Sequence, residues 1–177
     1  MIDKTTSESP TCSRAYETDA SGLTHWTDLH ADAWIGLLET HKQLTRALDG
    51  ELIARHGLSL SALELLARLV AADDRQLHLT ALATASGLSL SRVSRIIDAL
   101  EGRELVTRVA CPSDARAVHA KLTDAGLALV LAAQATHFAS VQAAFFDQLD
   151  AEEIATLARV FGKFAPQARG QCDAGRP

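Results

Sequence analysis

Cysteine is scarce in this sequence, with three residues among 177 and no closely spaced pair: Cys12, Cys111 and Cys172. An odd number of widely separated cysteines argues against a disulfide framework and fits a reducing compartment. The sequence also lacks an uninterrupted run of about 18 apolar residues, the length that a membrane-spanning helix needs. Residues 1–22 lack the basic start and the apolar run of a secretory signal. These absences predict a soluble, cytoplasmic protein that does not contact a membrane.

The short motifs of common catalytic sites are missing as well. The sequence has no Gly-rich phosphate loop, no His-Glu-x-x-His and no nucleophile elbow, so we expect neither an enzyme nor a cofactor. None of the seven histidines lies three or four residues from another histidine or a cysteine. That spacing would bring metal ligands to one helix face, so no metal site is predicted. Metal sensing, and redox sensing through Cys111, remain open as alternative modes of regulation.

Positive charge is concentrated in one segment of a chain that is acidic overall. The net charge of −5 argues mildly against a protein that coats nucleic acid indiscriminately. Residues 92–121, however, contain six basic and four acidic residues, so their net charge is +2. Two of the bases, Arg92 and Arg95, precede Arg103, Arg108, Arg116 and Lys121. We include Arg108, from the middle of this segment, among the predicted DNA contacts.

Helical patterns with one short β segment make up the rest of the sequence. Apolar spacing predicts helices over about 29–57, 61–72, 80–86, 89–102 and 123–145, with a last helix that starts at 150 and ends before Pro166. Alternating residues predict strands at 105–110 and 117–122, joined by a turn at 111–115. The predicted helix caps are Ser61 with Glu64, Thr80, Ser89 or Ser91, Thr123, and Asp150 with Glu153. The predicted fold class is mainly α with a small β-wing.

The last long predicted helix carries a coiled-coil-like seam. Its residues step alternately by four and three positions from Leu127 to Phe145. Together with the apolar stripe from Leu29 to Leu52, this seam offers more apolar surface than one thin chain covers. We therefore expect a homodimer.

A helix-turn-helix is predicted over residues 80–102. Small or apolar residues occupy the positions where the two helices would cross, and a glycine permits a left-handed turn between them: Leu82, Ala83, Gly87, Leu88, Val93 and Ile96. The other face of the second helix carries short polar and basic side chains that suit the base edges of the major groove: Ser89, Ser91, Arg92, Ser94 and Arg95. A helical hairpin in a core, and a helical interaction module that binds no DNA, remain alternatives.

The two predicted strands form a wing whose tip carries Asp114 and Arg116. A cation on such a projection can enter the minor groove while the carboxylate orients it. Both residues are therefore predicted DNA contacts. The alternative is a local ion pair on the surface.

Over about residues 34–165 the sequence resembles the MarR (multiple-antibiotic-resistance regulator) family of winged-helix repressors. The resemblance rests on Ser91-Arg-Val-Ser-Arg-Ile-Ile-Asp98 with Leu100-Glu101, on Leu105-Val106 with Arg108, and on Asp114-x-Arg116 followed by Leu122-Thr123 and Gly126. It implies ligand-modulated repression by a triangular homodimer whose first and last helices interleave and whose winged domains bind a pseudo-palindrome of double-stranded DNA. One departure is Glu104, where the family usually has glycine.

The sequence is also similar to the urate-responsive branch of that family, at Trp34-x-x-Leu-Leu38, His56-Gly-Leu-Ser-Leu60 and Cys111-Pro-Ser-Asp-Ala-Arg116. That branch places a tryptophan, an acid and arginines around an anionic ligand. The similarity implies a site for a small anionic or phenolic effector at Trp34, Glu64 and Arg92. Two alternatives stay open, because Glu64 also fits the Ser61 capping box and Trp34 also fits a core position.

These predictions divide the chain into five segments. A disordered tail is expected at 1–22 and a frayed tail at 167–177. Between them we expect an N-terminal dimerisation helix at 23–57, a winged helix-turn-helix DNA-binding domain at 58–123 and C-terminal dimerisation helices at 124–166.

Overall fold

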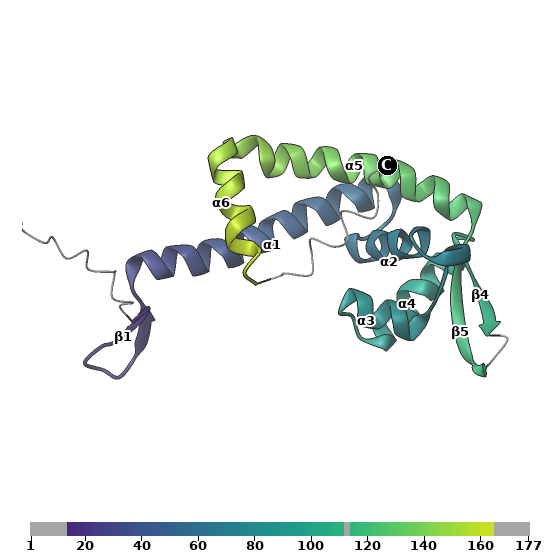
Figure 1. Ribbon diagram of the computed structural model, residues 1–177, viewed down its shortest axis with the longest axis horizontal. Helices are drawn as coiled ribbons and strands as arrows, with labels where there is room; N and C mark the ends of the chain where they lie inside the picture. Colours follow the sequence, from purple (N-terminus) through teal and green to yellow (C-terminus); the bar gives the residue numbers. More distant parts are fainter. Residues whose placement is uncertain (1–13, 112–113, 165–177) are drawn as a thin grey trace, which may run out of the picture. The chain divides into compact units, whose positions relative to one another are not determined.

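The protein, described by a computed structural model over residues 14–111 and 114–164, is mainly helical with two small antiparallel sheets (Figure 1). Side chains are described for the same residues except 111–117. The helices are α1 (Asp28–His56), α2 (Leu60–Val70), α3 (Leu79–Ser86), α4 (Leu90–Glu101), α5 (Asp124–Ala144) and α6 (Ala151–Phe161). The strands are β1 (Tyr16–Thr18), β2 (Thr24–Trp26), β3 (Gln76–His78), β4 (Val106–Cys111) and β5 (Asp114–Leu122). This agrees with the predicted fold class, and the chain divides into two compact units, residues 1–43 and 44–177.

The described part of the first unit contains a β-hairpin that the sequence analysis did not predict. β1 and β2 pair antiparallel, and Tyr16 lies opposite Trp26 with the two rings edge to face at 6.3 Å. The Asp19 carboxylate closes the turn by accepting the Ser21 and Leu23 N–H groups at 2.9 and 3.0 Å. Hydrogen bonding, above all from the Ser21 hydroxyl, lowers the pKa of Asp19. The structure thus differs from the loose tail expected at 1–22; residues 1–13, and the tail expected at 167–177, lie outside the described residues.

Three of the predicted helix caps are confirmed. Ser89 and Thr123 precede α4 and α5, and each side chain accepts the N–H three residues further on, at 3.3 and 2.9 Å. Asp150 and Glu153 form a reciprocal capping box at the start of α6. These side chains satisfy N–H groups that the first helical turn leaves without a backbone partner.

The predicted caps at Ser61 and Thr80 are wrong. Ser59 caps α2 and accepts the Ala62 N–H at 3.1 Å, because it has the extended backbone that a cap requires. Ser61 already lies inside the helix that begins at Leu60. α3 begins at Leu79, so Thr80 is also helical.

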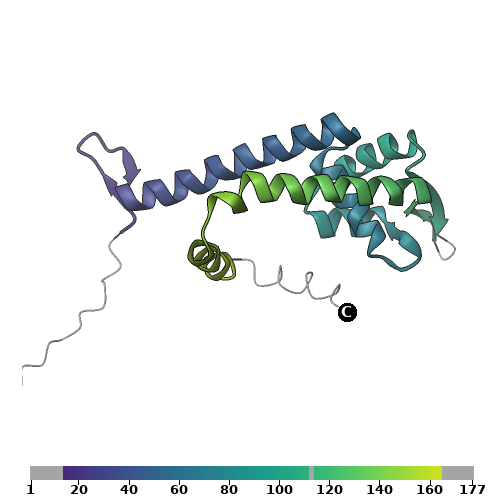
Figure 2. The same cartoon turned by 90° about the horizontal axis from the view of Figure 1, so that it is seen from above.

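The apolar core lies within the second unit, and α2 is its central element. The buried residues come from the end of α1, from α2, from α3 and α4, from the three-stranded sheet, from α5 and from two connections; among them are Leu65, Leu66, Leu69, Leu82, Val93, Ile97, Val106, Ala120 and Val130. No polar or charged residue is buried in the described part of the chain. Figure 2 shows α5 running across α2, which it contacts, in the view from above.

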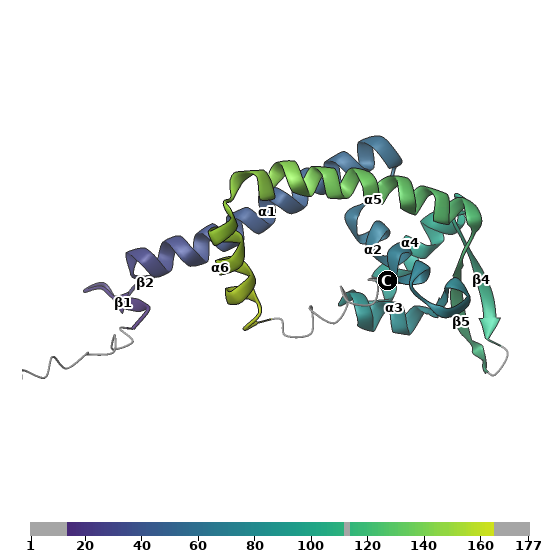
Figure 3. The same ribbon diagram turned by 45° about the horizontal axis from the view of Figure 1, so that its top comes forward.

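The winged part of the second unit contains a sheet of three strands in the order β3, β5, β4. β4 and β5 project beyond the helices as a twisted ribbon (Figure 3). β4 continues to Cys111 and β5 begins at Asp114, so the connection is shorter than the predicted turn at 111–115. β3 was not predicted, because three residues are too few to show a period of two.

The start of α5 is held tightly against the connection between α4 and β4. The Thr123 N–H donates to the Leu105 carbonyl at 3.1 Å, and the Thr123 hydroxyl donates to the Glu104 carbonyl at 2.8 Å. A Cβ on Gly126 would overlap the Leu105 carbonyl oxygen, so only glycine allows this approach. Glu104 has φ +60°, a left-handed conformation that costs a non-glycine residue about 1–2 kcal/mol. The connection is therefore short and strained, and it fixes where α5 begins.

α5 leaves most of its apolar surface uncovered within the described chain. The segment Asp124–Gln148, which is α5 with the short helical turn after it, is long and apolar enough to cross a membrane by length and composition alone. Only Gly126, Val130 and Ala133 of α5 are buried. Leu131 and Phe138 are 58% and 69% exposed. An apolar face of this extent indicates a surface that requires a partner.

Replacement of Gly126 by alanine is expected to destabilise the protein strongly. The new Cβ would overlap the Leu105 carbonyl, and the resulting displacement should lower the free energy of unfolding by about 3 kcal/mol, measured by urea denaturation. Gly50→Ala is the matched control, since a Cβ at that helical glycine meets nothing within 4 Å. The control should be neutral or stabilising by up to about 1 kcal/mol. Equal midpoints for Gly126→Ala and the unmodified protein would contradict the close approach.

Candidate nucleic-acid interface

The predicted helix-turn-helix is present as α3, a turn at Gly87, and α4. Gly87 has φ +68°, the left-handed conformation that ends α3 and redirects the chain. Leu82 of α3 and Val93 and Ile97 of α4 are fully buried, so the two helices share one packed contact. The turn and packing fix the direction in which the other face of α4 points.

The N-terminal turn of α4 presents small hydroxyls and free N–H groups. Ser89 and Ser91 are exposed, and their hydroxyl oxygens lie 3.2 Å apart. Because α4 begins at Leu90, the N–H groups of its first turn have no carbonyl partner within the helix. The Ser89 hydroxyl accepts one of them, the N–H of Arg92. A helix end of this kind favours a phosphate oxygen, and the hydroxyls can reach base edges.

Arg92 and Arg95 are exposed on the same face of α4 and form no ion pair with any described residue. Arg92 donates to the Ser61 hydroxyl at 3.3 Å, and Arg95 donates to the Ser91 carbonyl at 3.4 Å. Both contacts are long and neutral, so either guanidinium can exchange them for a charged partner at little cost. On this face of α4, Arg92 and Arg95 therefore carry positive charge that no described acidic side chain neutralises.

Arg108 differs from the other predicted DNA contacts, because its guanidinium is already engaged. It forms ion pairs with Asp98 and, at 2.9 Å, with Glu101, while its backbone N–H donates to Glu101 at 2.9 Å. It also donates to the carbonyl and hydroxyl of Ser94 at 3.4 and 3.3 Å. The hydrogen bond to Asp98 is the main cause that raises the pKa of Arg108. Arg108 therefore ties β4 to α4, and Ser94 is part of the same contact.

The wing residues Asp114 and Arg116 lie at the start of β5. The backbone pairs Asp114 with Cys111 after an irregularity at Ala110 and Cys111, so the ladder closes next to the tip. Residues 112 and 113, and the side chains of 111–117, lie outside the described part of the structure. The predicted contacts of Asp114 and Arg116 with DNA thus stay predictions.

The predicted ligand residues are not brought together by any described contact. Trp34 belongs to the first unit, where it is half exposed and its ring lies 6.5 Å from that of Trp26. Glu64 belongs to the second unit and forms an ion pair with Arg68 at 2.8 Å, one turn further along α2. Arg92 instead contacts Ser61.

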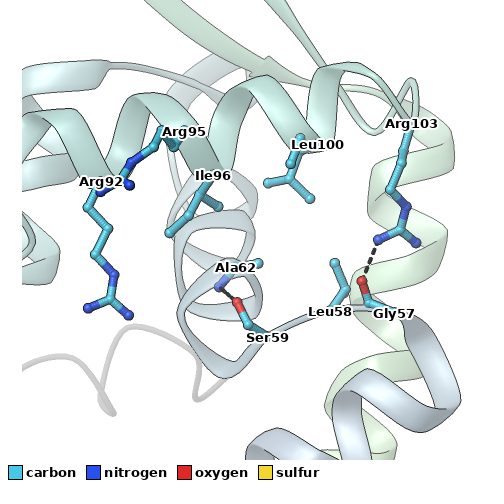
Figure 4. Close-up of a pocket in the computed structure, with 10 residues that line it drawn as sticks. Gly57, Leu58, Ser59, Ala62, Arg92, Arg95, Ile96, Leu100 and Arg103 are labelled. Atoms are coloured by element: carbon cyan, nitrogen blue, oxygen red, sulfur yellow. Dashed lines mark hydrogen bonds between the residues drawn. The ribbon is translucent and has the colours of Figure 1, made fainter.

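A pocket of about 600 Å³ lies between α4 and the start of α2 (Figure 4). Arg92, Arg95 and Arg103 contribute to its wall, and Leu58, Ile96 and Leu100 are among its apolar lining residues. Arg103 donates to the Gly57 carbonyl at 2.6 Å and to the His56 carbonyl at 3.1 Å, which ties the end of α4 to the end of α1. Arg103 was not predicted as a pocket residue, since nothing in the sequence spacing links it to Gly57, 46 positions away.

Comparison with known proteins gives a consistent result. Residues 58–118 match the model of the MarR family. The chain is similar to AbsC, a MarR family transcriptional regulator from Streptomyces coelicolor, with 33% identity, coverage of 82% of this chain and 98% of that one, and a TM-score of 0.73. It is also similar to Sco3205, a MarR family transcriptional regulator from the same organism solved in complex with DNA, with 30% identity, coverage of 80% and 89%, and a TM-score of 0.74. Wild-type MarR from E. coli in its apo form, at 22% identity, coverage of 74% and 94%, and a TM-score of 0.63, shares the fold. The search of curated proteins gives no match.

The two Streptomyces proteins match this chain over most of its length and most of their own. The exposed serines and arginines of α4 are positioned by that common framework. The chain therefore belongs to the MarR family and is a DNA-binding transcriptional regulator rather than an enzyme.

Proposed function

We propose that the protein is a cytoplasmic homodimeric repressor that binds a pseudo-palindromic operator and is released by a small anionic effector. The proposal that the protein binds DNA rests on the exposed face of α4. There, the helix N-terminus is surrounded by Ser89, Ser91, Arg92 and Arg95. Short hydroxyls and unpaired guanidinium groups at this end suit a helix that enters the major groove. Sco3205, whose structure contains DNA, supports the assignment by its similarity to this chain.

The predicted DNA residues divide into contacting and positioning groups. Arg92 and Arg95 are proposed to read bases, while Ser89 and Ser91 contact bases or phosphates. Asp114 and Arg116 are proposed to work in the minor groove from the wing. Arg108 and Ser94 are assigned to positioning, because Arg108 donates hydrogen bonds to Ser94, Asp98 and Glu101 and so holds the wing against the recognition helix.

The homodimer is supported by the apolar surface that the described chain leaves exposed. Large exposed side chains are concentrated on α1, α5 and α6, as at Ile35, Leu38, Leu131, Phe138 and Phe161. A second copy could cover these faces, and it would also account for the membrane-like composition of α5 without a lipid partner. Two recognition helices related by a twofold axis would then match two operator half-sites.

Light scattering at micromolar concentration is expected to give twice the mass of the chain. Leu131→Asp would put a charge on the proposed interface and should yield monomers, because an unpaired charge opposes burial. Leu90→Asp is the matched control, since Leu90 is a similarly exposed leucine on α4, outside the proposed interface. A monomeric unmodified protein, or equal dissociation by both variants, would contradict this interface.

Binding isotherms on the operator and on random DNA separate the proposed roles of the arginines. Arg92→Ala and Arg95→Ala should each cost about 1–3 kcal/mol on the operator and less on random DNA, since bidentate contacts to guanine carry sequence information. Arg116→Ala should weaken both DNAs to a similar extent. The protein's own upstream region is the first source of operator DNA. Equal losses on both DNAs for all three variants would contradict this division.

For the effector we propose the pocket between α4 and α2 in addition to the residues implied by the urate-responsive branch. Apolar lining residues such as Leu58 and Ile96, with arginines in the wall, suit a small aromatic anion. Arg92 and Arg95 belong both to this pocket and to the proposed base contacts. An anion bound there would compete with DNA for the same guanidinium groups. The effector would therefore bind the free protein more tightly than the protein–DNA complex, and this difference in affinity is what release requires.

A thermal-shift screen of urate, salicylate and protocatechuate, followed by titration of the protein–DNA complex, tests the effector site. A bound effector should weaken operator binding about 5- to 150-fold, the range of a coupling of about 1–3 kcal/mol. Arg103→Gln should abolish the response if the pocket holds the effector, because Arg103 is a pocket cation outside the proposed base contacts. Trp34→Ala should abolish it if the branch-like site is used. Release that persists in both variants would exclude both sites.

A further inference from the structure

Two histidines far apart in the sequence face each other on the three-stranded sheet. His78 is the last residue of β3, and the register places it directly opposite His119 of β5. Their ring centroids are 3.7 Å apart and the ring planes are inclined by 36°. The neighbouring pair, Leu77 and Ala120, faces the core, so the alternation of side chains puts both imidazoles on the outer face of the sheet.

Neither imidazole has a hydrogen-bond partner among the residues whose side chains are described, although both rings are partly buried. The buried side-chain nitrogens that lack a partner among the described residues are Arg68 Nε and His137 Nδ1, and neither belongs to this pair. Histidine binds metal ions through a ring nitrogen, and these two rings lie close enough for one ion to bind both once they turn.

We propose that His78 and His119 form a two-histidine chelate for a first-row transition-metal dication such as Zn²⁺, Ni²⁺ or Cu²⁺. Two nitrogens bound to one tetrahedral ion at about 2.0–2.1 Å lie about 3.3 Å apart, and the two rings spread away from the ion, so their centroids would lie farther apart than the 3.7 Å of the structure. Binding therefore requires the two rings to turn out of their present contact until one nitrogen of each points at the ion, and χ2 of histidine is a soft torsion that permits part of this turn. Imidazole ligands without a carboxylate select these ions over Mg²⁺ and Ca²⁺.

The affinity of this site is expected to be moderate. No group of three metal-ligating side chains occurs in the described part of the chain, so water would complete the coordination. Lys121 lies two residues along β5, opposite Gln76 in the next pair on the same face of the sheet, and its charge opposes a dication. Both features predict a readily exchanged ion rather than a permanent structural one.

A bound ion would link the two parts of the DNA-binding region. β3 leads directly into α3, the first helix of the helix-turn-helix, while β5 is a wing strand. The two strands pair over three residues only, so a metal bridge at their last pair would add a strong restraint to a short contact. We expect it to stabilise the winged unit.

Thermal unfolding of reduced, chelator-treated protein without a histidine tag tests this site, with ZnCl₂ or NiCl₂ as the probe. The metal should raise the Tm by roughly 5–10 °C at a concentration about 100 times its dissociation constant. His78→Gln and His119→Gln should each abolish the rise. His41→Gln is the control and should keep it, since His41 is exposed on α1.

A second measurement uses the unmodified protein and does not depend on how well the variants fold. Substoichiometric Cu²⁺ should broaden the imidazole NMR signals of His78 and His119 before those of the other five histidines. Preferential broadening of these two signals supports the chelate. An unchanged Tm in the unmodified protein, a rise that persists in His78→Gln and His119→Gln, or broadening that begins at other histidines would overturn it.

Discussion

The close approach of α5 to Leu105 at Gly126 is the constraint on which the DNA-binding unit depends. One short connection links the end of α4 to β4, and the Thr123 backbone and hydroxyl bind its carbonyls. The start of α5 therefore has a fixed position relative to both α4 and the base of the wing. If a second copy covers α5, as we propose, the same contact transmits the geometry of the dimer to the recognition helix. The left-handed backbone of Glu104 is the strain that accompanies such a short connection.

A second constraint is electrostatic and sorts the arginines of one basic segment into different roles. Arg108 is held by Asp98 and Glu101, so the acids of α4 are neutralised on the side that faces the wing. Arg103 is held by carbonyls at the end of α1. Arg92 and Arg95 have only long contacts to neutral groups and keep their charge available. The net charge of +2 over residues 92–121 therefore does not show which guanidinium groups are available. Arg92 and Arg95 can bind a ligand or DNA, whereas Arg103 and Arg108 are already engaged.

Several local features could be predicted from the sequence because they depend on neighbours within a few positions. Ser89 and Thr123 begin helices because a hydroxyl three residues before a free N–H satisfies it, and Gly87 turns the chain because glycine adopts positive φ. Other local patterns were ambiguous. Ser61 and Thr80 resemble caps, yet each lies two residues after the actual cap residue, Ser59 or His78, and is already helical. The β1–β2 hairpin is held by one aspartate and a pair of aromatic rings, a signal too small to recognise in a polar segment.

The sequence by itself determined the fold class, the helix-turn-helix, the polar face of α4 and the existence of a wing, because helical and strand periods and capping are short-range properties of the chain. The tertiary structure decided which of those residues meet. It paired Arg108 with Asp98 and Glu101, placed Arg103 on carbonyls 46 and 47 positions away, left Glu64 with Arg68 and stacked His78 on His119 across 41 positions of sequence. Such contacts depend on strand register and on helix packing, which the whole core fixes together, so no local pattern specifies them.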